Sequence, residues 1–447
     1  MKNKLPNFRC LQFRTRAPKQ KLTLWLIVSL LTVILVSLAC SLPSTPTTVP
    51  PTTTPSEIVK GLPSETPQLT DTPQIATVTP TDSPLPVDPD SFFPIYMPVG
   101  FVADPGILEN PILNAHELNG ELINHVPAPG FSAVGSPTSV HVAGGFSDGI
   151  IPPVVYVSTE NDGSLQYSEN GEIITAAIAP HISHLVGALG QTSMVYTTAR
   201  FEENVLISEL FIGNIETLNE IEPLMVRTDS AGWTIRPIAI DMLSEQPIGI
   251  WYSLTPWGIG GDIVFEPRQG LYYFDLTTNE IAETLDSSVN PVSFSPDLSW
   301  LAYTKEQMEQ PLTIIPNLET ERAITLPLAP DSDRGAGKAV FSPDNQYVAW
   351  MEASGFRLAA VPDFNILLRI ASTGGQMITE FPANSVAEAI GSQNIQWVEP
   401  VGWLDNENLL LQVRFDTWAQ TEIVSVKYDG SEMSALAAGN FANFIYP

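Results

Sequence analysis

Few residues of this 447-residue chain are spaced as catalytic groups would be. Residues Gly145 to Gly149 read Gly-Phe-Ser-Asp-Gly and match the GxSxG pattern of a nucleophile elbow. Such an elbow needs a strand before the serine, a helix after it, and an Asp and a His later in the chain. The sequence that follows is IIPP at 150–153 and then further strand-like runs. We therefore interpret the motif as a loop and expect no catalytic residue.

Metal ligation is also weakly supported by the sequence. His181 and His184 are three residues apart, a spacing that places side chains on opposite faces of a strand, and no adjacent Cys or carboxylate completes a zinc site. The acidic segments 160–163 and 331–333 offer oxygen ligands without the full set of an EF-hand loop. We expect no metal and no cofactor.

The stretch best suited to ligand binding is WYSLTPWGIGGDIVFEPR, from Trp251 to Arg268. It combines an aromatic platform with charged groups, as carbohydrate and peptide sites do. The candidate residues in it are Trp257, Asp262, Glu266 and Arg268. Arg200, Lys305, Arg357 and Trp418 are added because they occupy comparable connections elsewhere in the chain. The alternative is that Trp257 only caps a sheet and that the loop is structural.

Cys40 is a candidate for covalent modification. It follows an uncharged apolar run, Leu22 to Ala39, which is preceded by seven basic and no acidic residues, as in an export signal. The segment resembles a bacterial lipoprotein signal peptide, which implies cleavage before Cys40 and lipidation of its thiol. Ser37 departs from that family's pattern, where an apolar residue is usual.

The same apolar run supports a second interpretation. Eighteen residues in a helix span about 27 Å, close to the hydrocarbon core of a bilayer. The alternative is therefore an uncleaved single-pass anchor with its basic side in the cytoplasm. Either interpretation predicts an exported protein held at the cell membrane, with all residues after position 40 outside.

Composition limits the classes of partner. Cys10 lies in the leader, residues 1–39, so a chain that begins at Cys40 has one thiol and forms no internal disulfide. The folded domain must then be stabilised by its hydrophobic core. Beyond the leader, 13 Lys and Arg face 49 Asp and Glu. This acidic balance argues against nucleic acid or an anionic membrane face as partner. We expect a monomer.

Residues 40–90 read as a disordered tether. Ser41 to Asp90 contains 12 Pro and 12 Thr, with too little apolar content to repay the entropy of ordering. Such a segment favours extended conformations and could reach about 150 Å at about 3.1 Å per residue. Residues 1–39 then form the signal or anchor and 91–447 the folded domain.

From residue 91 onward, short apolar runs alternate with polar turns. Six segments read as a strand, a turn and a second strand, and they begin at Leu165, Leu210, Leu271, Leu312, Ile366 and Glu422. Their spacing averages about 51 residues, a period typical of propellers and similar arrays. We expect an all-β propeller of six blades, with seven or eight as alternatives.

A second repeat has the same phase. Phe294-Ser-Pro-Asp precedes Leu301-Ala-Tyr, and Phe341-Ser-Pro-Asp precedes Val348-Ala-Trp at the same spacing. Pro and Asp favour a tight turn between two strands. The motif resembles the WD-repeat-like units of TolB-type propellers, which also form the propellers of prolyl-oligopeptidase-like enzymes. Trp403-Leu-Asp-Asn is similar to a third copy. The motif carries no catalytic residue.

The predicted blades cover residues 136–180, 181–228, 232–287, 288–328, 335–383 and 394–438. The tail from Phe441 to Pro447 is expected to help close the ring, and 91–135 to add a strand or pack beneath it. The favoured function is a tethered, non-catalytic propeller that binds a protein, peptide or glycan. The alternative is an extracytoplasmic hydrolase or lyase with carboxylates in the central mouth.

Overall fold

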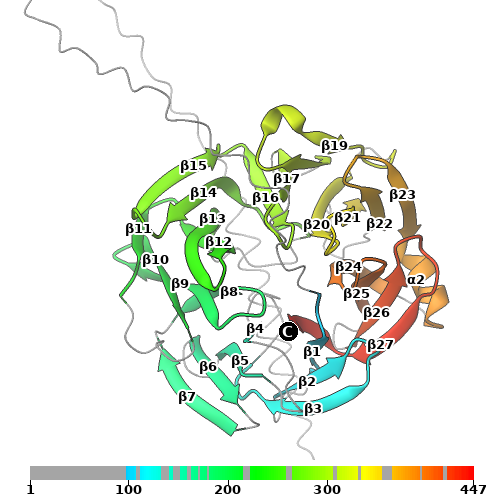
Figure 1. The fold of residues 1–447 in the computed structure, drawn as a ribbon, viewed down its shortest axis with the longest axis horizontal. Coiled ribbons are helices and arrows are strands. Elements are labelled where there is room, and N and C mark those ends of the chain that lie inside the picture. Colours follow the sequence, from blue (N-terminus) through cyan, green and yellow to red (C-terminus); the bar gives the residue numbers. More distant parts are fainter. Residues whose placement is uncertain are drawn as a thin grey trace, which may run out of the picture. The chain divides into compact units, whose positions relative to one another are not determined.

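The computed structural model shows a β-propeller built from seven four-stranded antiparallel sheets, which follow one another around a ring (Figure 1). The structure describes residues 97–447 except 107–110, 132–139, 144–151, 159–162, 170–171, 179–180, 215–221, 258–263, 306–309, 331–333, 355–364, 393–394 and 416–419. Residues Pro86–Pro447 belong to one compact unit. The structural statements below concern the described residues of this unit.

Blades 2 to 7 are continuous in sequence, and each is numbered from its innermost strand outward. Blade 2 contains β4 (Val140–Val142), β5 (Val154–Ser158), β6 (Ser164–Glu169) and β7 (Glu172–Ile178). Blade 3 contains β8 (Ile182–Gly187), β9 (Ser193–Glu202), β10 (Val205–Asn214) and β11 (Met225–Asp229). Blade 4 contains β12 (Trp233–Leu243), β13 (Gln246–Pro256), β14 (Gln269–Asp275) and β15 (Glu280–Leu285).

The remaining continuous blades repeat this order. Blade 5 contains β16 (Val289–Phe294), β17 (Trp300–Lys305), β18 (Leu312–Pro316) and β19 (Ile324–Leu326), with the short helix η2 (Thr320–Arg322). Blade 6 contains β20 (Gly335–Phe341), β21 (Tyr347–Ser354), β22 (Asn365–Ser372) and β23 (Met377–Pro382), followed by α2 (Ala383–Ala389). Blade 7 contains β24 (Ile395–Trp403), β25 (Asn408–Phe415), β26 (Thr421–Lys427) and β27 (Ser434–Ala438).

Blade 1 joins the two ends of the domain and corrects the expected number of blades. It contains β1 (Gly100–Asp104), β2 (Ile112–Glu117) and β3 (Leu122–Pro127), with β28 (Asn440–Ile445) as its innermost strand. The prediction of six blades was therefore one short, and seven, the first alternative, is the number found. Residues 91–135 do not supply a single strand, because they supply three of the four strands of a blade.

The C-terminal tail closes the ring, as expected. Antiparallel pairing joins Gly100 to Ile445 and Phe101 to Phe444, with a register shift after Val102. Phe101, Ala103, Phe441 and Phe444 share an apolar cluster with blade 7 residues such as Leu410. Closure by β28 pairs the inner edge of β1 that would otherwise be exposed.

Five of the six predicted hairpins and both FSPD turns are confirmed. These five form the third and fourth strands of a blade, for example β14 with β15 and β22 with β23. The hairpin predicted from Leu210 begins in β10, but its second strand, β11, starts at Met225, after the predicted segment ends at Leu224. Both FSPD motifs turn from an innermost strand into the second strand. In the first of them, Asp297 Oδ1 accepts from Ser295 Oγ at 2.7 Å and from Ser299 N at 3.0 Å. The motif thus sets the angle at which one strand returns beside another.

Candidate functional site

The innermost strands of blades 3 to 7 each carry a β-bulge. The pairing with the second strand shifts register at Ile182/His184, Pro237/Ala239, Pro291/Ser293, Gly337/Val340 and Pro400/Gly402. Proline has no N–H to donate to the ladder, and it is tolerated at a bulge because the ladder is interrupted there. A bulge increases local twist and re-aims the neighbouring side chains.

A polar side chain stands beside each bulge. These five residues are His184, Arg236, Asn290, Lys338 and Glu399. His184, Arg236 and Asn290 lie in the first half of their strands, and Lys338 and Glu399 lie at the middle of theirs. The strands start at the end of the ring where the second strand of each blade connects to the third; in blade 4, Trp233 pairs with Pro256 there. We call this the connection end. The five residues, with Glu266, Arg268 and Arg414, are called the inner-strand arc.

Glu266 and Arg268 reach the arc on a segment that crosses between blades. Residues 264–268, the crossing segment, lie between the second and third strands of blade 4. Val264 is 4 % exposed and belongs to the apolar cluster of blades 6 and 7, with Phe265 packed against it. A Cβ on Gly337 of β20 would lie 2.3 Å from Phe265 Cδ1, so the phenyl ring sits directly on that glycine. Blade 4 is thereby fixed to the inner strand of blade 6.

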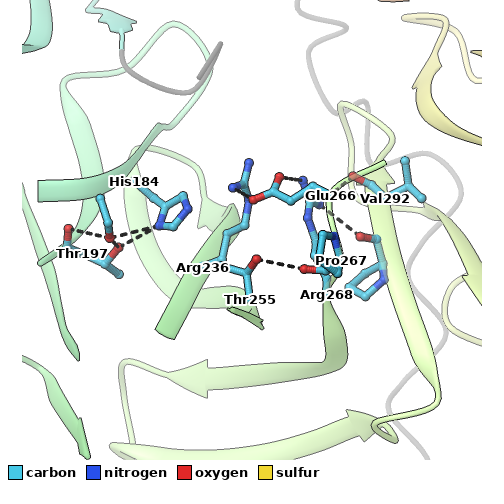
Figure 2. A network of polar contacts seen from close by, with 10 residues as sticks. His184, Thr197, Arg236, Thr255, Glu266, Pro267, Arg268 and Val292 are labelled. Carbon is cyan, nitrogen blue, oxygen red and sulfur yellow. Dashed lines mark hydrogen bonds and ion pairs between the residues drawn. The ribbon is translucent and has the colours of Figure 1, made fainter. Parts of the chain in front are cut away.

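Two guanidinium groups share the Glu266 carboxylate (Figure 2). Arg236 Nη1 pairs with Oε1, and Arg268 Nη2 lies 3.3 Å from Oε2. Arg268 Nη1 also donates to the carbonyl oxygens of Pro291 at 3.0 Å and Val292 at 2.9 Å, on the inner strand of blade 5. The crossing segment is further held by Thr255 Oγ1, which donates to Pro267 O at 2.8 Å.

The two arginines set the protonation of Glu266. Burial alone would raise its pKa, but the positive charges of Arg236 and Arg268 outweigh burial and lower the pKa of Glu266 to about 2. Burial and the nearby Arg268 lower the pKa of Arg236 to about 9, so the guanidinium stays protonated at neutral pH. The trio carries a net charge of about +1 at pH 7.

His184 stands next to this trio (Figure 2). Its Nδ1 lies 3.1 Å from Ser183 Oγ and 3.4 Å from Thr197 Oγ1, whereas Nε2 has no hydrogen-bond partner among the described residues. Burial, followed by the charge of Arg236, lowers the pKa of His184 well below its usual value. The ring is therefore neutral at pH 7, and Nε2 is a polar atom left for another group.

The arc continues into blades 6 and 7. Lys338 Nζ lies 3.2 Å from Glu399 Oε2, and Arg414 Nη2 lies 3.6 Å from Glu399 Oε1. Burial would raise the pKa of Glu399, but Lys338 and Arg414 lower it below its usual value. Lys338 also lowers the pKa of Glu266, which connects the two halves of the arc electrostatically.

Lys338 holds an unfavourable backbone conformation. Its φ is +52°, in the left-handed region that few residues other than glycine and asparagine adopt readily. A non-glycine residue held there costs about 1 kcal/mol or more, and such strain clusters at functional sites. The bulge thus keeps a cation in the arc at a cost to stability.

A separate ionic cluster in blade 6 has the character of a brace. Glu352 is fully buried and accepts from Arg369 Nη1 at 2.8 Å, Trp350 Nε1 at 3.1 Å and Ala329 N at 3.0 Å. Arg334 Nε lies 3.9 Å from Glu352 Oε2, the oxygen that accepts from Ala329 N. With its acceptors occupied by internal donors, Glu352 ties blade 5 to blade 6 and offers little to a ligand.

The structure brings together only part of the predicted rim. Glu266 and Arg268 lie in the arc. Trp257 is partly exposed at the connection end, where its backbone N–H donates to Gly232 O at 2.8 Å. Arg200 pairs with Glu209 at 2.5 Å within blade 3, and Lys305 is exposed at the end of β17. Asp262, Arg357 and Trp418 lie outside the described residues.

Of the motifs for which the sequence offers little reason to expect a function, the histidine pair lies within the described residues. His181 is exposed with φ +68° in the turn before β8, while His184 is buried, so the two rings are separated as predicted. The GxSxG serine and the acidic residues at 160–162 and 331–333 lie outside the described part of the chain. Within that part, no group of three His, Cys, Asp or Glu residues is arranged to hold a metal.

Sequence reasoning missed Arg236, Lys338, Glu399 and Arg414, and treated His184 as structural. One signal was available. Pro directly follows three of the arc's polar residues, Arg236, Asn290 and Glu399. A polar-Pro pair inside an apolar strand therefore marks the bulge and the side chain it directs.

Comparisons with known proteins yield structural similarity without sequence similarity. No protein-family model matches the chain, and no curated protein matches it in sequence. Prolyl oligopeptidase B from Galerina marginata, in its apo form, is similar over 78 % of this chain and 52 % of its own, at 10 % identity and a TM-score of 0.47. The chain thus spans about half the length of that enzyme.

TolB proteins are also among the similar solved structures. TolB from Acinetobacter baumannii is 12 % identical, with a TM-score of 0.38, over 78 % of this chain and 81 % of its own. A putative TolB from Agrobacterium tumefaciens is 10 % identical, with a TM-score of 0.37, over 59 % and 83 %. The assignment of the fold rests on the seven sheets described above.

Proposed function

We propose that the chain is an exported, membrane-tethered propeller that binds a protein, peptide or glycan, without catalysis, at the connection end of the ring. The observation that carries this proposal is the inner-strand arc. Four of the twelve cations of residues 91–447 lie in this arc and pair with Glu266 or Glu399. Ligand-binding sites typically contain a small number of convergent polar groups that fix the orientation of the ligand.

The ionisation of the arc favours binding over acid–base catalysis. A glycosidase needs one carboxylic acid with a raised pKa beside a carboxylate. Both arc carboxylates have lowered pKa values because each is flanked by two cations. Asp241 does have a pKa raised by burial, and it accepts from Tyr273 Oη at 3.0 Å, but it lies toward the opposite end of β12.

The proposed address rests on the N-terminal sequence. Cys40 would be lipidated after cleavage, and residues 41–90 would hold the propeller away from the membrane as a monomer. The apolar run 22–39 lies outside the described residues; within those residues, no helix is long and apolar enough to cross a bilayer. The alternative remains an uncleaved anchor formed by this run.

Affinity capture with matched variants tests the binding function. The full chain, purified in detergent, is used as bait against extract of the cells that produce it, beside Trp257→Ala and Leu243→Ala. Both positions lie in blade 4, Trp257 at the connection end and Leu243, 67 % exposed, at the opposite end. We expect Leu243→Ala to retain the captured partner and Trp257→Ala to lose at least half of it. Equal recovery by the two variants would remove the connection end as the binding surface.

A further inference from the structure

The inner-strand arc is a cationic site in an acidic protein. Residues 91–447 contain 12 Lys and Arg against 43 Asp and Glu, and residues 91–199 contain no Lys or Arg at all. The arc nevertheless combines four cations with two carboxylates and a neutral histidine. Its local charge is about +2 at pH 7, opposite in sign to the surrounding surface.

The side chains of the arc have binding capacity left over. Arg236 is 7 % exposed, and its Nε and Nη2 donate to no described residue. His184 Nε2 likewise has no partner among the described residues. Asn290, 5 % exposed, donates from Nδ2 to Thr304 Oγ1 at 3.2 Å, while its buried Oδ1 has no acceptor role in the described part of the chain. Buried polar atoms are normally paired, so the unpaired Oδ1 of Asn290, in the blade next to Arg236, points to a ligand.

The protein also shows which group suits these cations. Glu266 and Glu399 are amino-acid carboxylates, and each is gripped by two of the arc's cations. Guanidinium forks match carboxylates in shape as well as in charge. A ligand carboxylate would meet the same donors, and the amide N–H groups beside it would match the acceptors of Asn290 and His184.

The backbone conformation of Lys338, with φ +52°, is an independent indication. Asparagine or glycine would relieve the conformational cost at this bulge, so a lysine there is explained by its ammonium group. The Lys338 side chain is a third exposed, and its ammonium carries three donors, more than its contact with Glu399 uses.

We propose that the arc binds a carboxylate of an acidic peptide segment. This inference rests on the proposed function, because it names the ligand class of the same site. A peptide is favoured over an acidic glycan because the aromatic groups that pack directly on the arc and its strands are committed to packing. Trp397 is 6 % exposed under the Arg414 guanidinium, and Phe265 sits on Gly337. No aromatic platform for a sugar ring is therefore seen among the described residues of the arc.

The test uses fluorescence anisotropy with the full chain in detergent and three labelled probes. The probes are heptaglutamate, heptaglutamine and a heptamer of galacturonic acid. We expect heptaglutamate alone to bind well, with an affinity that falls as salt rises. Equal binding of heptaglutamine would overturn the proposal, and preference for the galacturonate would assign the site to a glycan instead.

Matched charge variants locate the binding. Lys338→Asn removes one cation and keeps a residue suited to positive φ, and we expect it to weaken heptaglutamate binding about tenfold or more, the value of one charge-assisted contact. Lys305→Asn removes an exposed cation from the same end of the ring and should change affinity less than twofold. Equal losses in both variants would show unspecific attraction and contradict the site.

A variant that is expected to bind heptaglutamate more tightly distinguishes a change in the site from a folding defect. Glu266→Gln removes the internal carboxylate that occupies Arg236 and Arg268, so we expect heptaglutamate to bind about three times more tightly or better. Weaker or unchanged binding would contradict competition for these cations. If the capture experiment finds a partner at the connection end while heptaglutamate does not bind, this inference fails alone; if no partner is captured there, the proposed function fails as well.

Discussion

Replacing Gly337 by alanine tests how the crossing segment is seated. The added Cβ would lie 2.3 Å from Phe265 Cδ1, 2.9 Å from Cε1 and 3.1 Å from Cγ. Favourable carbon–carbon contacts are near 3.5–4.0 Å, so the ring or the strand must move by about 1 Å. Phe265 packs on the core of blades 6 and 7, which leaves it little room to do so.

The size of the effect follows from two opposing contributions. Overpacking of this kind costs about 1–3 kcal/mol. Alanine in place of glycine restricts the unfolded chain and returns about 0.4–1 kcal/mol. We therefore expect Gly337→Ala to lower the free energy of unfolding by about 1–2 kcal/mol. The assay is urea denaturation followed by tryptophan fluorescence.

Two further variants make the prediction specific. Gly374 lies in the same blade, and a Cβ there would meet nothing closer than Ser372 Oγ at 3.6 Å, so Gly374→Ala should change stability by less than about 0.5 kcal/mol. Phe265→Leu removes the clashing ring atoms and should recover part of the loss caused by Gly337→Ala. A double-mutant cycle should show about 1 kcal/mol of coupling between positions 265 and 337. If the changes in unfolding free energy at positions 265 and 337 were additive, or if the Gly337→Ala variant were as stable as Gly374→Ala, the contact of the crossing segment with blade 6 would be refuted.

Three other predictions concern acid stability, ring closure and anchoring. Burial lowers the pKa of His141 to about 4, below the 6.5 of an unfolded histidine. The stability contribution of the neutral His141 is therefore complete above pH 6.5 and is lost as the pH falls toward 4. At 1.36 kcal/mol per pKa unit, the loss in the free energy of unfolding is about 3 kcal/mol. Unfolding at pH 4.5 and 7 should show a flatter pH dependence for His141→Gln, and an unchanged slope in this variant would contradict the role of His141. Phe444→Ala should lower the free energy of unfolding by about 3–5 kcal/mol, because the ring is 7 % exposed in the cluster that closes blade 1; a loss below 1 kcal/mol would contradict closure by β28. Cys40→Ala should abolish the mass increment of a lipid and release the protein from membranes, and a variant that stays membrane-bound would indicate the uncleaved anchor.

The fold could be predicted where its pattern is local. Hairpins such as 271–285 have both strands and their turn within one short stretch, and both FSPD turns are encoded by consecutive residues. Blade 1 could not be counted in the same way, because its innermost strand lies more than 300 residues from the strand it pairs with. Pairing between Phe101 and Phe444 depends on the curvature of the whole ring.

The same distinction between local and long-range patterns applies to the residues of the site. Glu266 and Arg268 stand in an unusually long connection, which a sequence makes visible. Arg236 and Glu399 lie inside apolar strands, and their meeting with groups of other blades depends on bulges and on the course of the crossing segment. A charge in an apolar strand signals a buried partner, but the identity of that partner is set by the ring.

Photo-crosslinking at the two ends of blade 4 tests the central claim most directly. Benzoylphenylalanine is placed at position 257, at the connection end, and in a second protein at position 243, at the opposite end of the same blade. Both full-length chains are irradiated in the membranes of the producing cell. We predict a discrete crosslinked partner from position 257 that disappears when Lys338→Asn is added, and none from position 243. A partner crosslinked from position 243, or one from position 257 that persists without Lys338, would contradict binding at the inner-strand arc.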